Sequence, residues 1–131
     1  SKKQPRKKSQ PKLTEYKSRE GYRILVGKNN MQNDYITCHL ASRGDMWFHT
    51  KNIHGSHVVV LCDGKELSDK TILFAASLAA KNSKASESAN VPVDYTPIKY
   101  VKKPNGAKPG MVIYTTNKTV YVTPYIEGEN L

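Results

Sequence analysis

The sequence contains two cysteines, Cys38 and Cys62, and neither belongs to a Cys-x-x-Cys motif. Each lies among apolar or strand-forming neighbours, which is typical of a reduced structural thiol and argues against a disulfide framework. No apolar run approaches the roughly 20 residues that a membrane helix requires. The N-terminal cations are not followed by the apolar region of a signal peptide. We therefore expect a cytoplasmic protein with both thiols reduced.

Catalytic motifs are also scarce. Residues 27–30 (Gly-Lys-Asn-Asn) lack the glycine spacing of a phosphate-binding loop or a dinucleotide fingerprint. His49, His54 and His57 fall within nine positions, and with Asp45 nearby they could ligate zinc, so a small metal-dependent hydrolase is the alternative function. Their spacing matches no familiar ligand framework. We expect a binding module without catalytic residues, metal or cofactor, in which His49 and His57 pair across a hairpin or satisfy buried groups.

Positive charge is what the sequence has in abundance. The 131 residues include 21 Lys and Arg against 11 Asp and Glu, a net charge of +10, with a pI near 9.6 and a mean hydropathy of −0.63. Residues 1–19 hold eight of the cations and one acid, Glu15, leaving 13 basic against 10 acidic residues for the remainder. A polyanionic partner is favoured, although a lysine-rich tail that only keeps the domain solvated is the alternative.

The chain divides into a tail and one domain. Residues 1–19 combine Lys, Ser, Gln and Pro with few large hydrophobic residues, which predicts a flexible basic linker. The tail is expected to add non-specific, salt-sensitive affinity for a polyanion. On a single-stranded nucleic acid, each neutralised phosphate contributes ~0.7 to the slope of log K against log salt. Residues 20–131 are long enough for one compact domain and too short for two with separate cores.

Within the domain, residues 22–26 predict a strand, and residues 45–50 and 57–62 predict a hairpin joined by a turn at Gly55-Ser56. A helix is expected over residues 69–82, capped by Ser68 and carrying an alanine-rich apolar stripe.

Two further regions complete the sheet. Residues 29–41 favour a helix capped at Asn29 or Asn30. Residues 93–101 alternate as a strand in which Pro97 argues for an edge or a bulge, and residues 111–115 and 119–123 predict a second hairpin. The expected fold is α+β: a mixed, largely antiparallel sheet with two main helices on one face, preceded by a disordered basic tail.

Two polar clusters are candidate RNA-binding sites. Residues 27–34 carry three Asn, one Gln and one Asp, whose side chains can read base edges or sugar hydroxyls; helix capping is the alternative role. In a strand over residues 45–49, Asp45, Trp47 and His49 share one face. That face is either a base-stacking platform or part of the core.

Several motifs agree in order with one family. They are Val26-Gly27-Lys28-Asn29-Asn30, Gln32-Asn33-Asp34, Asp45-Met46-Trp47-Phe48-His49, Gly55-Ser56-His57-Val58, Ala75-Ala76 with Ala79, Val93-Asp94-Tyr95-Thr96, Lys102-Lys103-Pro104 and Pro109-Gly110. Together they resemble the RNA-binding domain at the C-terminal end of NFACT proteins, the ribosome-associated quality-control factors related to bacterial fibronectin-binding proteins. Lys28 stands where the family usually has Arg, and His54 where it usually has Pro, which weakens the metal-site alternative.

The resemblance implies an RNA clamp that engages tRNA, the large ribosomal subunit, or both, with the remaining NFACT domains as partners if the chain is a fragment. Adhesion to fibronectin is a third hypothesis, for which the sequence offers no anchor or disulfide framework. The residues expected to contact RNA are Lys28, Asn29, Asn30, Gln32, Asn33, Asp34, Arg43, Asp45, Trp47, His49, Lys51, Ser56, His57, Lys102 and Lys103.

Overall fold

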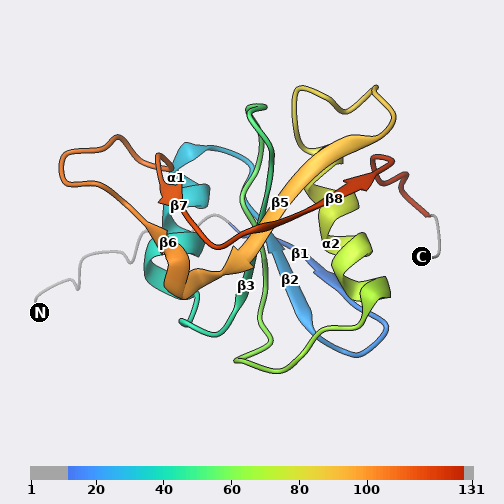
Figure 1. The fold of residues 1–131 in the computed structure, drawn as a ribbon, viewed down its shortest axis with the longest axis horizontal. Coiled ribbons are helices and arrows are strands. Elements are labelled where there is room, and N and C mark those ends of the chain that lie inside the picture. Colours follow the sequence, from blue (N-terminus) through green and yellow to red (C-terminus); the bar gives the residue numbers. More distant parts are fainter. Residues whose placement is uncertain (1–11, 129–131) are drawn as a thin grey trace, which may run out of the picture.

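The structure, a computed structural model, describes residues 12–128 (Figure 1). Its elements in chain order are β1 (Thr14–Lys17), β2 (Arg23–Val26), α1 (Asn30–Asp34), the π-helix η1 (Tyr35–Leu40), β3 (Met46–Thr50), β4 (Val58–Val60), α2 (Asp69–Lys81), β5 (Val91–Pro97), the 3-10 helix η2 (Ile98–Tyr100), β6 (Val101–Lys102), β7 (Ile113–Tyr114) and β8 (Lys118–Val122). No helix of the described part is long and apolar enough to cross a membrane.

A six-stranded sheet in the order β1-β2-β4-β3-β5-β8 forms the centre of the fold, and each of its strand pairs is antiparallel. The short strands β6 and β7 form a separate antiparallel ribbon. Phe48 of β3 pairs with Val58 of β4, so the hairpin predicted from residues 45–50 and 57–62 is confirmed. The α+β class predicted from the sequence is confirmed as well.

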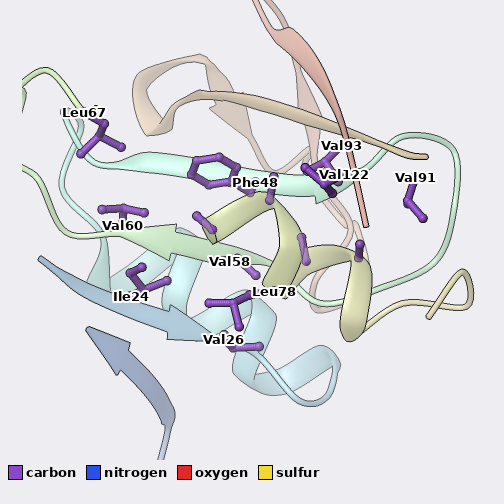
Figure 2. Packing of buried hydrophobic residues seen from close by; sticks show 14 of the residues in the cluster. Ile24, Val26, Phe48, Val58, Val60, Leu67, Leu78, Val91, Val93 and Val122 are labelled. Carbon is purple, nitrogen blue, oxygen red and sulfur yellow. The ribbon is translucent and has the colours of Figure 1, made fainter. Parts of the chain in front are cut away.

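The sheet is apolar on both faces, and a different set of elements packs on each face. Alternation along the strands sends Ile24, Phe48 and Val58 toward α2, as Figure 2 shows, whereas Leu25 and Trp47 join a second cluster on the opposite face. Figure 1 places α1 and the β6-β7 ribbon on the other side of β3 and β5 from α2. The prediction that both helices lie on one face is therefore wrong. An apolar sheet face left exposed to water would lose roughly 25 cal/mol of stabilising free energy per Å², so both faces are covered.

Helix α2 follows the prediction closely. The Ser68 Oγ accepts a hydrogen bond from the Thr71 backbone N–H at 3.2 Å, which caps the first turn. At the other end, the Asn82 side chain donates to the Leu78 carbonyl at 2.8 Å. The alanines Ala75, Ala76, Ala79 and Ala80 are buried against the sheet. Their small side chains let the helix axis lie close to the strands.

Residues 14–17, which the sequence assigned to the flexible tail, form the edge strand β1 against β2. Tyr16 packs edge-on against Phe74 and Tyr125, with ring centroids 6.1 and 5.7 Å apart. A strand with one large apolar residue on this face gives a weak local signal, because its stability comes from a surface that the rest of the chain builds. Residues 1–11 of the predicted tail lie outside the described residues.

The second predicted hairpin is wrong. Ile113 of β7 pairs with Lys102 of β6, while Lys118 of β8 pairs with Tyr95 of β5. Both partners lie upstream, and a long basic loop over residues 103–112 brings β7 back to β6. Pro97 is the last residue of β5 and marks no bulge. Strand β5 lies between β3 and β8, but its pairing with β8 stops at Tyr95, so Pro97 pairs with Met46 of β3 alone and occupies a local edge.

Candidate nucleic-acid interface

Three segments distant in sequence meet beside the start of α1: residues 28–33, 54–57 and 81–84. Backbone hydrogen bonds join them, from the Ser56 N–H to the Asn82 carbonyl at 2.9 Å and from the Lys84 N–H to the His54 carbonyl at 3.0 Å. The Gly27 N–H donates to the His57 carbonyl at 3.0 Å. The loop between β3 and β4 is thus fixed to the end of α2 on one side and to the end of β2 on the other.

The polar turn before α1 is a reciprocal helix cap. The Asn29 side-chain oxygen accepts from the Gln32 N–H at 2.9 Å, and the Gln32 side-chain oxygen accepts from the Lys28 N–H at 2.9 Å. Asn29 and Gln32 are therefore engaged in local structure, as the capping alternative holds, and the Asn29 cap is confirmed. Asn30 is exposed and projects from this turn as a candidate contact.

Asn33 fastens this turn to β4. Its side chain is 5% exposed, and its Oδ1 accepts from the His57 N–H at 3.0 Å. The contact requires glycine at position 27, because a Cβ there would lie 2.0 Å from the Asn33 Oδ1. Gly27 thus explains how the strand and the helix approach each other so closely.

A cleft of about 320 Å³ opens over the three segments, and we call it the basic cleft. Lys28, Lys81 and Lys84 line it, and among the described residues no acid does. The Lys28 ammonium donates to the Asn82 side chain at 2.6 Å. Lys81 lies 3.2 Å from the exposed Glu127, an ion pair that contributes little at a surface. The cleft concentrates positive charge over a rigid backbone frame, which attracts an anionic chain.

A second hollow, also about 320 Å³, adjoins the cleft and shares Asn30, Asn33, His54 and Gly55 with it. We call it the aromatic pocket. The remaining lining residues come from β3, the β3–β4 loop and the segment that runs into β7: Trp47, His49, Asn52, Ile53, His57, Gly110, Met111, Val112 and Tyr114.

Trp47 is the hub of the ring cluster in this pocket. It is 1% exposed, so of the two roles considered from the sequence, packing in the core is the one its burial supports. Its ring stacks on His49 with centroids 5.7 Å apart and planes 7° from parallel. Tyr114 and His57 lie 4.7 and 5.3 Å from it. His49 and His57 lie side by side across the hairpin, with centroids 5.6 Å apart.

Both histidines are held neutral. Burial, with the neighbouring His49, lowers the pKa of His57 to about 3. Burial also lowers the pKa of His49. The His57 Nδ1 lies 2.7 Å from the Thr37 hydroxyl, which orients the ring. At neutral pH the pocket therefore presents flat uncharged rings beside a positively charged cleft.

Asp34 holds the far wall of the pocket in place. Its Oδ1 lies 2.8 Å from the Lys103 ammonium and accepts from the Gly110 N–H at 3.0 Å. The hydrogen bond from Lys103, followed by that from Gly110, lowers the pKa of Asp34. Asp34 and Lys103 thus anchor the segment that runs into Met111.

Asp94 supports the pocket from behind. It accepts from the Tyr114 hydroxyl at 2.5 Å and the Thr119 hydroxyl at 2.6 Å, and Lys51 lies 3.1 Å away. Burial raises the pKa of Asp94, but the hydrogen bonds from Thr119, Tyr114 and Lys51 outweigh it, so the net shift is downward. Lys51 is therefore paired with a buried acid.

Three of the predicted contact residues lie apart from this site. Asp45 is buried at the opposite end of β3, where it accepts from the backbone N–H groups of Ser42 and Asp63 at 2.7 and 2.9 Å. Arg43 belongs to the same turn, and Lys102 is exposed on β6. Of the other predicted residues, Lys28, Asn29, Asn30, Asn33 and Ser56 line the cleft, and Asn30, Asn33, Trp47, His49 and His57 line the pocket.

The sequence prediction missed the residues at the end of α2 and after the basic loop. Residues 81–84 (Lys-Asn-Ser-Lys) fall at the expected end of the helix over residues 69–82, and their two lysines were the available signal. Tyr114 was assigned to a hairpin strand. Neither could be linked to the site without the long-range contacts that bring them there.

The histidines do not form a metal centre. Within residues 12–128, no group of three or more His, Cys, Asp or Glu side chains is placed to hold a metal ion. The hydrolase alternative, which required His49, His54 and His57 with Asp45, therefore lacks its ligand cluster.

Comparisons with known proteins identify the family. Residues 12–116 match the family described as NFACT protein RNA binding domain. The chain is 56% identical over 114 residues to the Rqc2 homolog RqcH of Bacillus subtilis (strain 168), a match covering 87% of this chain and 20% of that protein. The Rqc2 homolog RqcH of Streptococcus suis (strain 05ZYH33) is 52% identical over 101 residues, covering 77% of this chain and 18% of that protein.

A solved structure is also similar. The C-terminal part of the fibronectin/fibrinogen-binding protein from Streptococcus suis superposes with a TM-score of 0.83 at 46% identity, covering 88% of this chain and 47% of that chain. The chain spans about 20% of the length of the curated relatives in Bacillus subtilis and Streptococcus pneumoniae. The family match includes the three segments of the basic cleft and the wall of the aromatic pocket, and the chain belongs to the NFACT RNA-binding domain family.

Proposed function

We propose that this chain is the non-catalytic RNA-binding module of a larger cytoplasmic protein of ribosome-associated quality control, and that it engages tRNA, large-subunit ribosomal RNA, or both. Family membership supports RNA as the partner. The observation that carries the proposal is the basic cleft: three lysines on a fixed backbone frame, beside a pocket of neutral rings. Lysines attract phosphates, and rings accept unstacked bases.

The lysines at the end of α2 test the proposal. Lys81→Gln with Lys84→Gln removes two cations from the cleft. If both meet phosphates, the slope of log K against log salt should flatten by roughly 1.4, at ~0.7 for each phosphate on single-stranded RNA. Fluorescence anisotropy with a labelled single-stranded RNA, repeated at several salt concentrations, measures this slope.

A matched control removes the same charge elsewhere. Lys65 and Lys70 are exposed, with Lys70 in the first turn of α2, at the other end of the helix from Lys81. Lys65→Gln with Lys70→Gln should leave the slope near that of the unaltered protein. Equal effects of the two double variants would refute the cleft as the phosphate site. No binding to RNA at low salt would refute the function itself.

The RNA class is decided by competition. Transfer RNA and ribosomal RNA fragments, added to the labelled complex, should displace the probe more effectively than a duplex DNA of equal length. The similarity to a fibronectin/fibrinogen-binding protein provides a second candidate function. Immobilised fibronectin tests that candidate directly, and it would be supported only by saturable binding that RNA does not compete away.

A further inference from the structure

The aromatic pocket differs from the basic cleft in charge. Within residues 12–128, no Lys, Arg, Asp or Glu lines it, and burial keeps its two inner histidines neutral. A phosphate entering it would lose water without gaining an opposite charge, which costs several kcal/mol. A volume of about 320 Å³ lies at the lower end of the roughly 300–1,000 Å³ of small-ligand pockets. The pocket therefore suits one small, flat, uncharged group.

The pocket wall also holds a hydrogen-bond donor that lacks an acceptor. Within residues 12–128, the Trp47 Nε1 is the buried side-chain nitrogen or oxygen without a hydrogen-bond partner. A tryptophan nitrogen can only donate, and leaving such a group buried and unpaired is costly. Trp47 also lines the pocket, so a ligand whose acceptor atom reaches the indole edge would supply the missing partner. Nucleobases carry such acceptors at ring nitrogens and carbonyl oxygens.

The rim of the pocket offers a surface for stacking. Met111 lines the pocket and is 61% exposed, and a thioether makes favourable contacts with aromatic faces. Asn30 and Asn33 belong to both the pocket and the cleft, so a group in the pocket lies directly beside the lysines. A nucleotide joins its base to a phosphate through one sugar, so two adjoining hollows suit its two ends.

We propose that the aromatic pocket receives one unstacked nucleobase of a single-stranded RNA while the flanking phosphates lie in the basic cleft. This inference rests on the RNA binding proposed above. The base lies against the neutral rings that line the pocket, and its acceptor meets the Trp47 indole N–H. The cleft attracts the phosphates of any RNA sequence. The pocket adds a requirement for a base that is not stacked on its neighbouring bases.

The single tryptophan makes the test direct, because the chain contains no other indole. In a two-dimensional ¹H–¹⁵N NMR spectrum, the Trp47 side chain gives one signal, and backbone amides of Ser83 and Lys84 report on the cleft. Two probes are compared: a short oligouridine or oligoadenine, and an abasic oligomer with the same sugar and phosphate count. We expect the cleft amides to move with both probes and the indole signal to move only with the base-containing RNA.

The outcomes separate the two proposals. Cleft amides that move with both probes, combined with an indole signal that moves with neither or equally with both, would overturn the base pocket and leave RNA binding standing. If no amide moves with either probe, the proposed function fails as well.

A pair of matched variants supplies the energetic test. Met111 and Ile113 lie on the same segment, 61% and 60% exposed, but only Met111 lines the pocket. In the unaltered protein, the abasic oligomer should bind about tenfold more weakly than the RNA, within the range of base-stacking energies. Met111→Ala should reduce this ratio by weakening RNA and not abasic binding, whereas Ile113→Ala should preserve it. Equal ratios in all three proteins would contradict the base pocket.

Discussion

His57 should make the free energy of unfolding depend on pH. Its ring is 3% exposed, and burial lowers its pKa from 6.5 to about 3. The unfolded chain releases the ring to its ordinary pKa, so between pH 6.5 and pH 3 the unfolded state binds more protons than the folded state. Stability from this group is therefore fully present above pH 6.5 and is lost as the pH falls.

The size of the loss follows from the two pKa values. Between about pH 7.5 and about pH 5, an unfolded pKa of 6.5 against a folded pKa of about 3 costs roughly 2 kcal/mol of unfolding free energy. His49, whose pKa burial also lowers, acts in the same direction. Asp34 and Asp94 have ordinary pKa values of 3.8, so their contributions are lost mainly below this window. A comparison that stops at about pH 5 therefore reports mainly on the histidines.

Urea unfolding at the two pH values, followed by the fluorescence of Trp47, measures the loss. His57→Asn retains a side chain that can hydrogen-bond with the Thr37 hydroxyl but has no titratable ring, so its loss between the two pH values should be smaller by about 2 kcal/mol. The readout is the difference within each protein, which a lower starting stability does not alter. Lys65→Gln leaves every histidine in place and should retain the full loss. If His57→Asn loses as much as the unaltered protein, the pH dependence does not come from this ring.

Two substitutions test how the site is held together. Gly27→Ala should destabilise the fold by about 1–3 kcal/mol, since the new Cβ overlaps the Asn33 side chain. The double variant with Asn33→Ala should lose less unfolding free energy than the sum of the two single variants. Strict additivity in urea unfolding would refute this contact. Asp34→Ala should speed hydrogen exchange of the Gly110 amide by about tenfold or more, because a hydrogen bond to a charged group contributes roughly 1.5–3 kcal/mol; unchanged exchange would show that the segment is held otherwise.

The local sequence pattern predicted those elements whose stabilising contacts lie close together in the sequence. Helix α2 has its cap and its alanine stripe within residues 68–82, and the β3–β4 hairpin has both strands and the turn within a short span. Local pattern could not predict that β7 pairs with β6 and β8 with β5. These pairings depend on the strand beside which the chain is placed after each connecting loop. The same holds for β1, whose weak local pattern is supported by the neighbouring core.

The site shows the same division. The polar turn at residues 28–34 was visible in the sequence, and the capping role of Asn29 and Gln32 was one of its two possible roles. The contribution of residues 81–84 was not visible, because it arises from the backbone contacts of Ser56 and His54 with the end of α2. The resemblance identified the family, but it could not assign each polar residue to a cleft, a pocket or a support.

The most direct test of the account is to map where RNA touches the protein. An RNA carrying 4-thiouridine is bound, crosslinked with ultraviolet light and digested, and mass spectrometry identifies the attached peptides. We predict crosslinks in the segments that line the cleft and the pocket, namely residues 28–33, 49–57, 81–84 and 110–114. Crosslinks confined to the turn of Arg43 and Asp45, or to residues 63–70, would place the RNA elsewhere and contradict the account.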